Sequence, residues 1–174
     1  MPIDTKTAPR RDLHFASLDE AVADVRALVG QPLRTTGNRT PDDLVGHLAD
    51  SIEANVDGVD ASAIPLVVRL LAVPVRPYLR NRFCHRPMPA GATLPEAMNA
   101  QFNTGRCPDL AAAADAYEAA VRRLREAKML PKHPVFGTFA IGECEQFHCR
   151  HAELHLSFIH PAAATPDDTG KQPS

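Results

Sequence analysis

The sequence predicts an all-α protein: a single-domain four-helix bundle with a long, proline-rich crossover between its second and third helices. Three observations favour this fold. Four segments repeat apolar residues at helical spacing, most of them begin with a capping signal, and no segment alternates convincingly with period two. The 174 residues are about the size of one ordinary domain. We therefore expect one helical core and little or no sheet.

The first predicted helix begins at Ser17, where Ser17 and Glu20 have the spacing of a capping box. Gly30 ends the segment. Its apolar residues recur at spacings of four, three and four: Leu18, Val22, Val25 and Val29. This pattern is typical of a helix with one buried face.

The second predicted helix runs from Thr40 to Gly58. Thr40 is a good N-cap residue, Pro41 suits the first helical position, and acidic residues follow where the helix dipole is positive. Its apolar stripe consists of Leu44, Leu48 and Ile52.

The predicted crossover spans residues 61–108, where seven prolines lie between Pro65 and Pro108. Proline removes a backbone donor and disrupts helix interiors. We expect a kinked helix within 64–80 and one or two helical turns within 95–102.

The third predicted helix begins near Asp109 and carries a 4-3-4-3 seam of Leu110, Ala114, Tyr117, Val121 and Leu124. The fourth is expected over 140–159. The domain then covers 11–160, with flexible tails at 1–10 and 161–174, which are rich in polar residues and proline.

The overall composition argues against two classes of partner, nucleic acids and membranes. The net charge is −2, and no basic face or Lys/Arg block stands out, so we expect no nucleic-acid partner. The longest apolar stretch is too short to cross a bilayer, and no signal peptide is evident, so we expect no membrane association. The four cysteines form no C-x-x-C motif. The expected location is the cytoplasm.

Three histidines on the last predicted helix need an explanation. At 100° per residue, His148, His151 and His155 fall within an arc of about 60°, on the apolar face. Burying an imidazole without a partner costs on the order of 1–3 kcal/mol. One metal ion would satisfy several imidazoles at once, so this cluster predicts a metal site.

The spacing of His151 and His155 is i, i+4, which lets both rings converge on one ion. The alternative is a pair of surface histidines, which is common at this spacing. The zinc-peptidase motif H-E-x-x-H does not apply, because Glu153 stands one place too late and points about 200° away from both rings.

His47, at the edge of the second helix's apolar stripe, is the best candidate for a third ligand. Asp43 and Asp50 lie at i−4 and i+3, where they could orient its second nitrogen or ligate through water. The alternative is a half-exposed histidine that simply pairs with these acids.

Other candidates are less specific. His148 could be a fourth ligand, a donor behind the ligands, a general base or a packed side chain. Cys144, on the same face, could be a soft ligand or reactive thiol, although a small buried apolar role is commoner. His133, before Pro134, suits a structural role, with its side chain bonding backbone amides while Phe136 plugs the bundle end. The remaining histidines form no constellation: His14, His85 and His160.

Two segments carry a family resemblance. The stretch GNRTPDDLVGHLA at 37–49 resembles the start of the second helix in the DinB-like superfamily. HPVFG at 133–137 and FHCRHAELHLSF at 147–158 resemble the last helix of one branch, known only as a domain of unknown function. The resemblance implies a DinB-like four-helix bundle that holds one divalent metal, usually nickel or zinc, on His47, His151 and His155. It also implies frequent homodimers.

The sequence departs from that pattern at four positions. Arg39 and Cys144 stand where tryptophan is expected, Ala140 where a Ser or Thr N-cap is usual, and Leu154 where another histidine is common. The three ligand positions are unaffected.

Two kinds of function follow. Some DinB-like proteins are similar to transferases that use a low-molecular-weight thiol, so one expectation is a metal-dependent thiol transferase, or a hydrolase, acting on a small molecule. The alternative is a non-catalytic, metal-stabilised bundle in ligand binding or stress response. A metal-free bundle with hydrogen-bonded histidines is a third interpretation.

Overall fold

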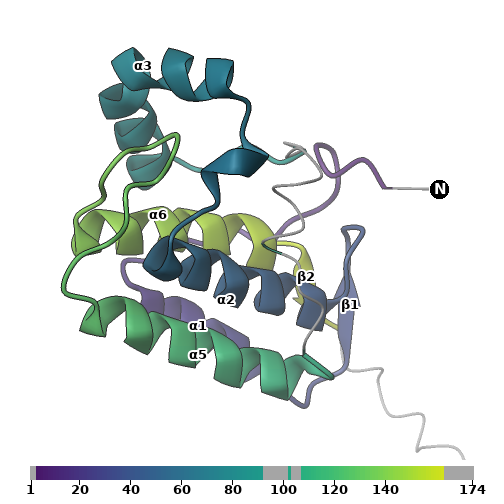
Figure 1. Ribbon diagram of the computed structural model, residues 1–174. Coiled ribbons are helices and arrows are strands. Elements are labelled where there is room, and N and C mark those ends of the chain that lie inside the picture. Colours follow the sequence, from purple (N-terminus) through teal and green to yellow (C-terminus); the bar gives the residue numbers. More distant parts are fainter. Residues whose placement is uncertain (1–2, 92–101, 103–106, 163–174) are drawn as a thin grey trace, which may run out of the picture.

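The computed structural model describes residues 3–91, 102 and 107–162. Its described part is mostly helical, with a two-stranded sheet, and this confirms the helical fold class in its coarse form. The elements in chain order are α1 (Leu18–Leu28), β1 (Leu33–Thr35), α2 (Pro41–Asp57), a 3-10 turn (Ala61–Ala63), α3 (Leu66–His85), α5 (Leu110–Glu126), α6 (Ile141–Leu156) and β2 (Ile159–Pro161) (Figure 1).

In the described part of the chain, most of the core comes from four helices. α2 packs most extensively on α5 and also contacts α6, while α1 contacts both α5 and α6 (Figure 1). The apolar stripes expected from the sequence face inward. Fully buried members from the four helices are Leu18, Val25, Leu48, Ile52, Tyr117, Leu124 and Leu156.

The predicted helix starts are confirmed. The Ser17 hydroxyl accepts from the Glu20 amide, and the Glu20 carboxylate accepts from the amide of Ala16. The Thr40 hydroxyl caps α2 by accepting from the Asp43 amide. At α5, the Asp109 carboxylate accepts from Ala112. Each cap satisfies an amide that the first helical turn leaves without an internal partner.

The crossover contains more helix than the sequence indicated. α3 runs through Pro74 and Pro77 and continues to His85, five residues beyond the expected segment. Figure 1 shows α3 bent and lying outside the other helices, and it packs against α6. The turns expected within 95–102 lie outside the described residues, except for Phe102.

The expected end of the last helix was wrong by three residues. α6 ends at Leu156, and the chain then forms β2, whose Ile159 pairs antiparallel with Thr35 of β1. Two strands of three residues are too short to show period-two alternation, which explains why the sequence did not predict them.

Residues 3–11, which include most of the expected N-terminal tail, contact the folded chain. The Ile3 amide donates to the Asn38 side chain, the Thr36 hydroxyl donates to the carbonyl of Pro9, and the Arg11 amide donates to Ser157. Of the expected C-terminal tail, residues 163–174 lie outside the described part. Among the described residues, no helix has both the length and the apolarity needed to cross a membrane.

Candidate metal centre

Three imidazoles converge between α2 and α6. Nε2 of His47 lies 3.3 Å from Nε2 of His151, and Nε2 of His155 lies 2.9 Å from the same atom. One nitrogen from each ring lies within 4.8 Å of the others. The structure thus brings together the three histidines that the sequence singled out; we call them the histidine triad.

Local sequence explains this placement. His47 lies in the middle of a helix whose start is fixed by Thr40 and Pro41. His151 and His155 are one turn apart on α6, so both rings leave the same face. His47 is buried, whereas His151 and His155 are half-buried. The triad therefore lies at the edge of the core.

The proton on His47 can be assigned. Its Nδ1 lies 2.8 Å from the backbone carbonyl oxygen of Phe102, and a carbonyl only accepts hydrogen bonds. Nδ1 therefore carries the proton of the neutral ring, and the Nε2 lone pair points toward His151. A hydrogen bond from the distal nitrogen to a carbonyl is the arrangement that orients metal-ligating histidines.

The hydrogen-bonding capacity of neutral rings does not account for both short contacts. Because Nε2 of His47 is an acceptor, its contact needs a proton on Nε2 of His151. That single N–H does not also make a linear hydrogen bond to His155, 2.9 Å away. Three lone pairs directed at one cation remove the conflict. The donor set fits a divalent metal.

Burial keeps the triad neutral, as ligation requires. It is the largest cause that lowers the pKa of each ring, and for His151 and His155 the pKa falls well below the usual value. The neighbouring rings lower the pKa of His151 and His155 further. The Arg39 charge lowers the pKa of His47 and His155, whereas the Phe102 carbonyl raises that of His47.

His148 lies behind the triad. Its ring centroid is 6.2 Å from that of His151, and its Nε2 lies 3.3 Å from the side-chain nitrogen of Asn55. An amide nitrogen only donates, so Nε2 of His148 accepts and Nδ1 carries the proton. Burial lowers the pKa of His148 to about 3. Its Nε2 is thus committed to Asn55 and lies outside the group of converging nitrogens.

The structure gives Nδ1 of His47 a partner other than Asp43 or Asp50, the backbone carbonyl of Phe102. The charge of Asp50 raises the pKa of His47, against the effect of burial. No local pattern in the sequence indicates a contact with Phe102, which is 55 positions away from His47. Arg39, noted only as a departure from the family pattern, proves to lie close enough to influence two of the rings.

Cys144 belongs to the core. It is fully buried, and burial raises the pKa of its thiol to about 12. Its sulfur is not part of the converging group. The structure therefore supports the commoner interpretation of Cys144 as a small apolar residue.

Glu153 is turned away from the triad, as its helical position predicted. Its carboxylate accepts from the Phe15 amide at 2.6 Å and pairs with Arg150 at 2.8 Å. Glu153 thereby links the segment before α1 to helix α6. A base role resembling that of zinc peptidases is thereby excluded on geometry.

The structural role predicted for His133 is confirmed. Its Nδ1 accepts from the amides of Val135 and Phe136, at 3.1 and 3.2 Å. Phe136 packs against Phe139 and Phe147. The remaining histidines stand apart from the converging nitrogens: His14, His85 and His160.

Comparison with known families confirms the expected domain of unknown function. The model of a family described as "Protein of unknown function (DUF1569)" matches residues 7–162. The protein is thus a helical protein with a histidine triad at the edge of its core. The chain belongs to this family of unknown function. No curated protein and no solved structure is significantly similar to it.

Proposed function

We propose that the protein is a DinB-like four-helix bundle that binds one divalent metal, nickel or zinc, through His47, His151 and His155. The observation that carries the proposal is the convergence of three Nε2 atoms with contacts of 2.9 and 3.3 Å. Imidazole nitrogen suits both metals, and three protein ligands leave a coordination position open in catalytic zinc sites.

We further propose a metal-dependent transferase that uses a low-molecular-weight thiol, or a hydrolase, with a small molecule as substrate. A divalent cation in such a site acts as a Lewis acid on water or on a thiol. The protein's own residues would hold and orient it: Phe102 fixes the ring of His47, and Arg39 supplies a positive charge nearby. His148 is a weak candidate for a general base, because its pKa is about 3 and Asn55 occupies its Nε2.

Three of the chain's four thiols are poorly suited to react as thiolates, which favours an external co-substrate over these three. Cys84, Cys144 and Cys149 are buried, and burial raises the pKa of each thiol to between about 11 and 12. None of the four cysteines is in a disulfide, which suits a reducing compartment such as the cytoplasm.

The non-catalytic alternative is a bundle that the metal only stabilises. The two versions differ in the expected behaviour of His151→Ala. If the metal is structural, the variant should lose the metal and melt at a lower temperature, because the binding of a structural metal contributes to folding. A catalytic metal predicts a folded variant that has lost activity. His85→Ala, on the exposed end of α3, is the matched control.

A thermal-shift measurement with N-acetylcysteine tests the thiol version. The thiol should raise the melting temperature of the metal-loaded protein, because a ligand that binds only the folded state stabilises it. It should not affect metal-free protein or His151→Ala. Equal shifts in all three would contradict a thiol site at the triad.

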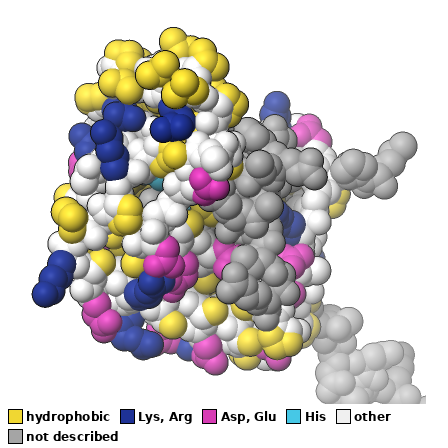
Figure 2. Space-filling model, in the orientation of Figure 1, with side chains coloured by type: hydrophobic (Ala, Val, Ile, Leu, Met, Phe, Trp, Pro, Cys, Tyr) yellow, Lys and Arg dark blue, Asp and Glu magenta, His cyan; other side chains and the backbone are white. Residues whose placement is uncertain are grey.

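We also propose that the protein forms a homodimer through the exposed face of α3. This face consists of apolar side chains exposed by 44–69%: Val67, Val68, Leu71, Val75 and Tyr78. Figure 2 shows hydrophobic side chains gathered over this helix. Exposed apolar patches of this kind mark interaction sites, and a second copy offers the same uncharged surface.

A further inference from the structure

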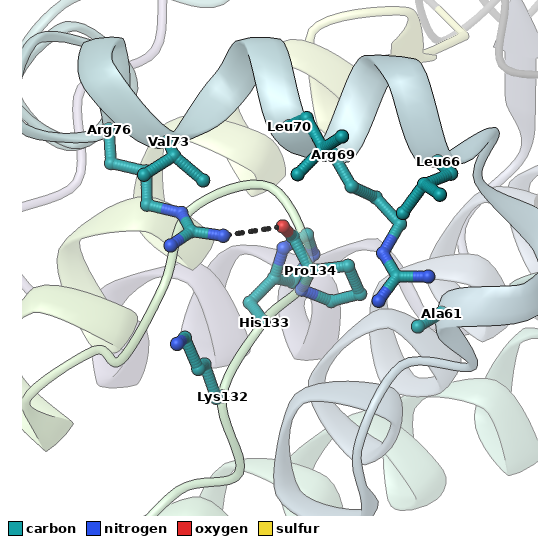
Figure 3. A pocket seen from close by; sticks show the side chains of 9 residues that line it. All are labelled: Ala61, Leu66, Arg69, Leu70, Val73, Arg76, Lys132, His133 and Pro134. Atoms are coloured by element: carbon teal, nitrogen blue, oxygen red, sulfur yellow. Dashed lines mark hydrogen bonds between the residues drawn. The ribbon is translucent and has the colours of Figure 1, made fainter.

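A second site lies away from the triad, between α3 and the loop that contains Lys132, His133 and Pro134. These elements border an open cavity of about 240 Å³ (Figure 3). None of the triad residues lines it. The volume is slightly below the range of about 300–1,000 Å³ typical for drug-sized ligands, so a compact molecule is the expected occupant.

One wall of this cavity is apolar. Leu66, Leu70 and Val73 come from successive turns of α3, at spacings of four and three, so they face the cavity together. They remain 63%, 62% and 48% exposed in the structure. An apolar ligand that covers these side chains removes them from water, and this burial favours binding.

All the charged side chains of the lining are cationic. Arg69 and Arg76 descend from α3 on either side of Pro134, and Lys132 comes from the loop below (Figure 3). No Asp or Glu lines the cavity. Three positive groups around one space repel one another, and an anion placed among them would relieve that repulsion.

Arg76 is held in place before any ligand arrives. Its Nε donates to the Val135 carbonyl at 3.1 Å, and one terminal nitrogen donates to that of Pro134 at 3.0 Å. These contacts use two of the five N–H groups of a guanidinium. A fixed guanidinium loses less entropy on binding an anion than a free one does.

We propose that this cavity binds a small organic anion with an apolar body, such as a medium-chain monocarboxylate. The carboxylate would lie among Arg69, Arg76 and Lys132, where charge-assisted hydrogen bonds are strong. The alkyl portion would cover Leu66, Leu70 and Val73. This site is separate from the proposed metal centre and does not depend on it.

Titration calorimetry of the full chain with octanoate tests the proposal. Octanoate should bind saturably, while acetate, which lacks the apolar body, and octylammonium, which has the opposite charge, should bind at least about tenfold more weakly. Arg69→Gln and Lys132→Gln should each weaken octanoate binding by about tenfold, since each removes a charged donor. Lys132 is exposed, so its variant should fold normally.

Two matched controls make the result specific. Arg122→Gln removes the same charge from the exposed surface of α5 and should leave octanoate binding unchanged. His151→Ala should also bind octanoate normally, because a loss there would mean that the carboxylate binds at the triad. The proposal is overturned if octanoate gives no saturable binding, if octylammonium binds equally well, or if Arg69→Gln behaves as Arg122→Gln does.

Discussion

Nδ1 of His47 lies 2.8 Å from the backbone carbonyl oxygen of Phe102, and this contact fixes the side of the ring that faces the other two histidines. The Phe102 ring also packs edge-on against His47, with centroids 6.3 Å apart. Because Phe102 belongs to the proline-rich crossover, that segment takes part in orienting the proposed metal ligands.

Phe102→Ala should therefore weaken metal binding. Loss of an outer-shell partner typically costs about 10–100-fold in metal affinity, and the truncated residue no longer anchors its carbonyl against His47. Competition with a chromogenic chelator measures the change. Phe158→Ala is the control, because Phe158 is buried to a similar degree, 6% exposed against 7%. An equal loss of affinity in both variants would assign the effect to general destabilisation.

Metal-free protein should lose stability as the pH falls from about 6.5 to about 4. Burial and the Arg76 charge lower the pKa of His133 from 6.5 to about 4. Below pH 6.5 the unfolded chain takes up a proton at this position and the folded chain does not, so unfolding becomes more favourable. The change is up to about 1.4 kcal/mol per pH unit for each such residue, and it stops below the folded pKa.

His133→Asn isolates this effect in urea denaturation curves at pH 7, 6, 5 and 4. The asparagine oxygen can still accept from the amides of Val135 and Phe136, but it does not titrate. The variant should show a shallower pH dependence than the original protein, with His148 supplying part of the remaining slope. Identical slopes would show that His133 is not buried in its neutral form.

Native thiol reactivity should be confined to Cys107. The other three cysteines are buried, with the pKa of each thiol raised to about 11 or 12, so little thiolate is present at neutral pH. Cys107 is half-buried. Mass spectrometry after brief iodoacetamide treatment should find one label in the folded chain, none in Cys107→Ser, and four in denaturant. Rapid labelling of Cys144 in the folded state would contradict its place in the core.

The proposed dimer predicts a simple effect of Leu71→Asp. Leu71 is 69% exposed, so the carboxylate should not affect folding of the single chain, but it would be buried without a partner in the dimer. Sedimentation should show a dimer for the original protein and a monomer for the variant. Arg122→Asp, on an exposed position of α5, should remain dimeric. A monomeric original protein would contradict the proposed interface.

Local signals in the sequence predicted the helices well where they were self-contained. Ser17, Thr40 and Asp109 each cap a helix with their own side chains, so the signal and the structure lie within a few residues. The i, i+4 pair on α6 likewise follows from one helix alone. The convergence of His47 with that pair was also anticipated from apolar faces and from the family resemblance.

Features that depend on distant contacts were missed. The hydrogen bond to Phe102 joins residues 55 positions apart, and the β1–β2 pairing joins the connection between α1 and α2 to the segment after α6. α3 continues through two prolines, and it is supported by its arginines, which donate to carbonyls of the 134–138 loop, and by its packing on α6. None of these interactions leaves a periodic pattern in the local sequence.

Metal content provides the most direct test of the account. Protein purified without an affinity tag, then equilibrated with zinc or nickel and desalted, should contain one ion per chain. His47→Ala, His151→Ala and His155→Ala should each bind far less, while His85→Ala should match the original protein. A content below about a tenth of an ion per chain after this loading would contradict the proposed centre, since three converging neutral imidazoles should retain a divalent metal.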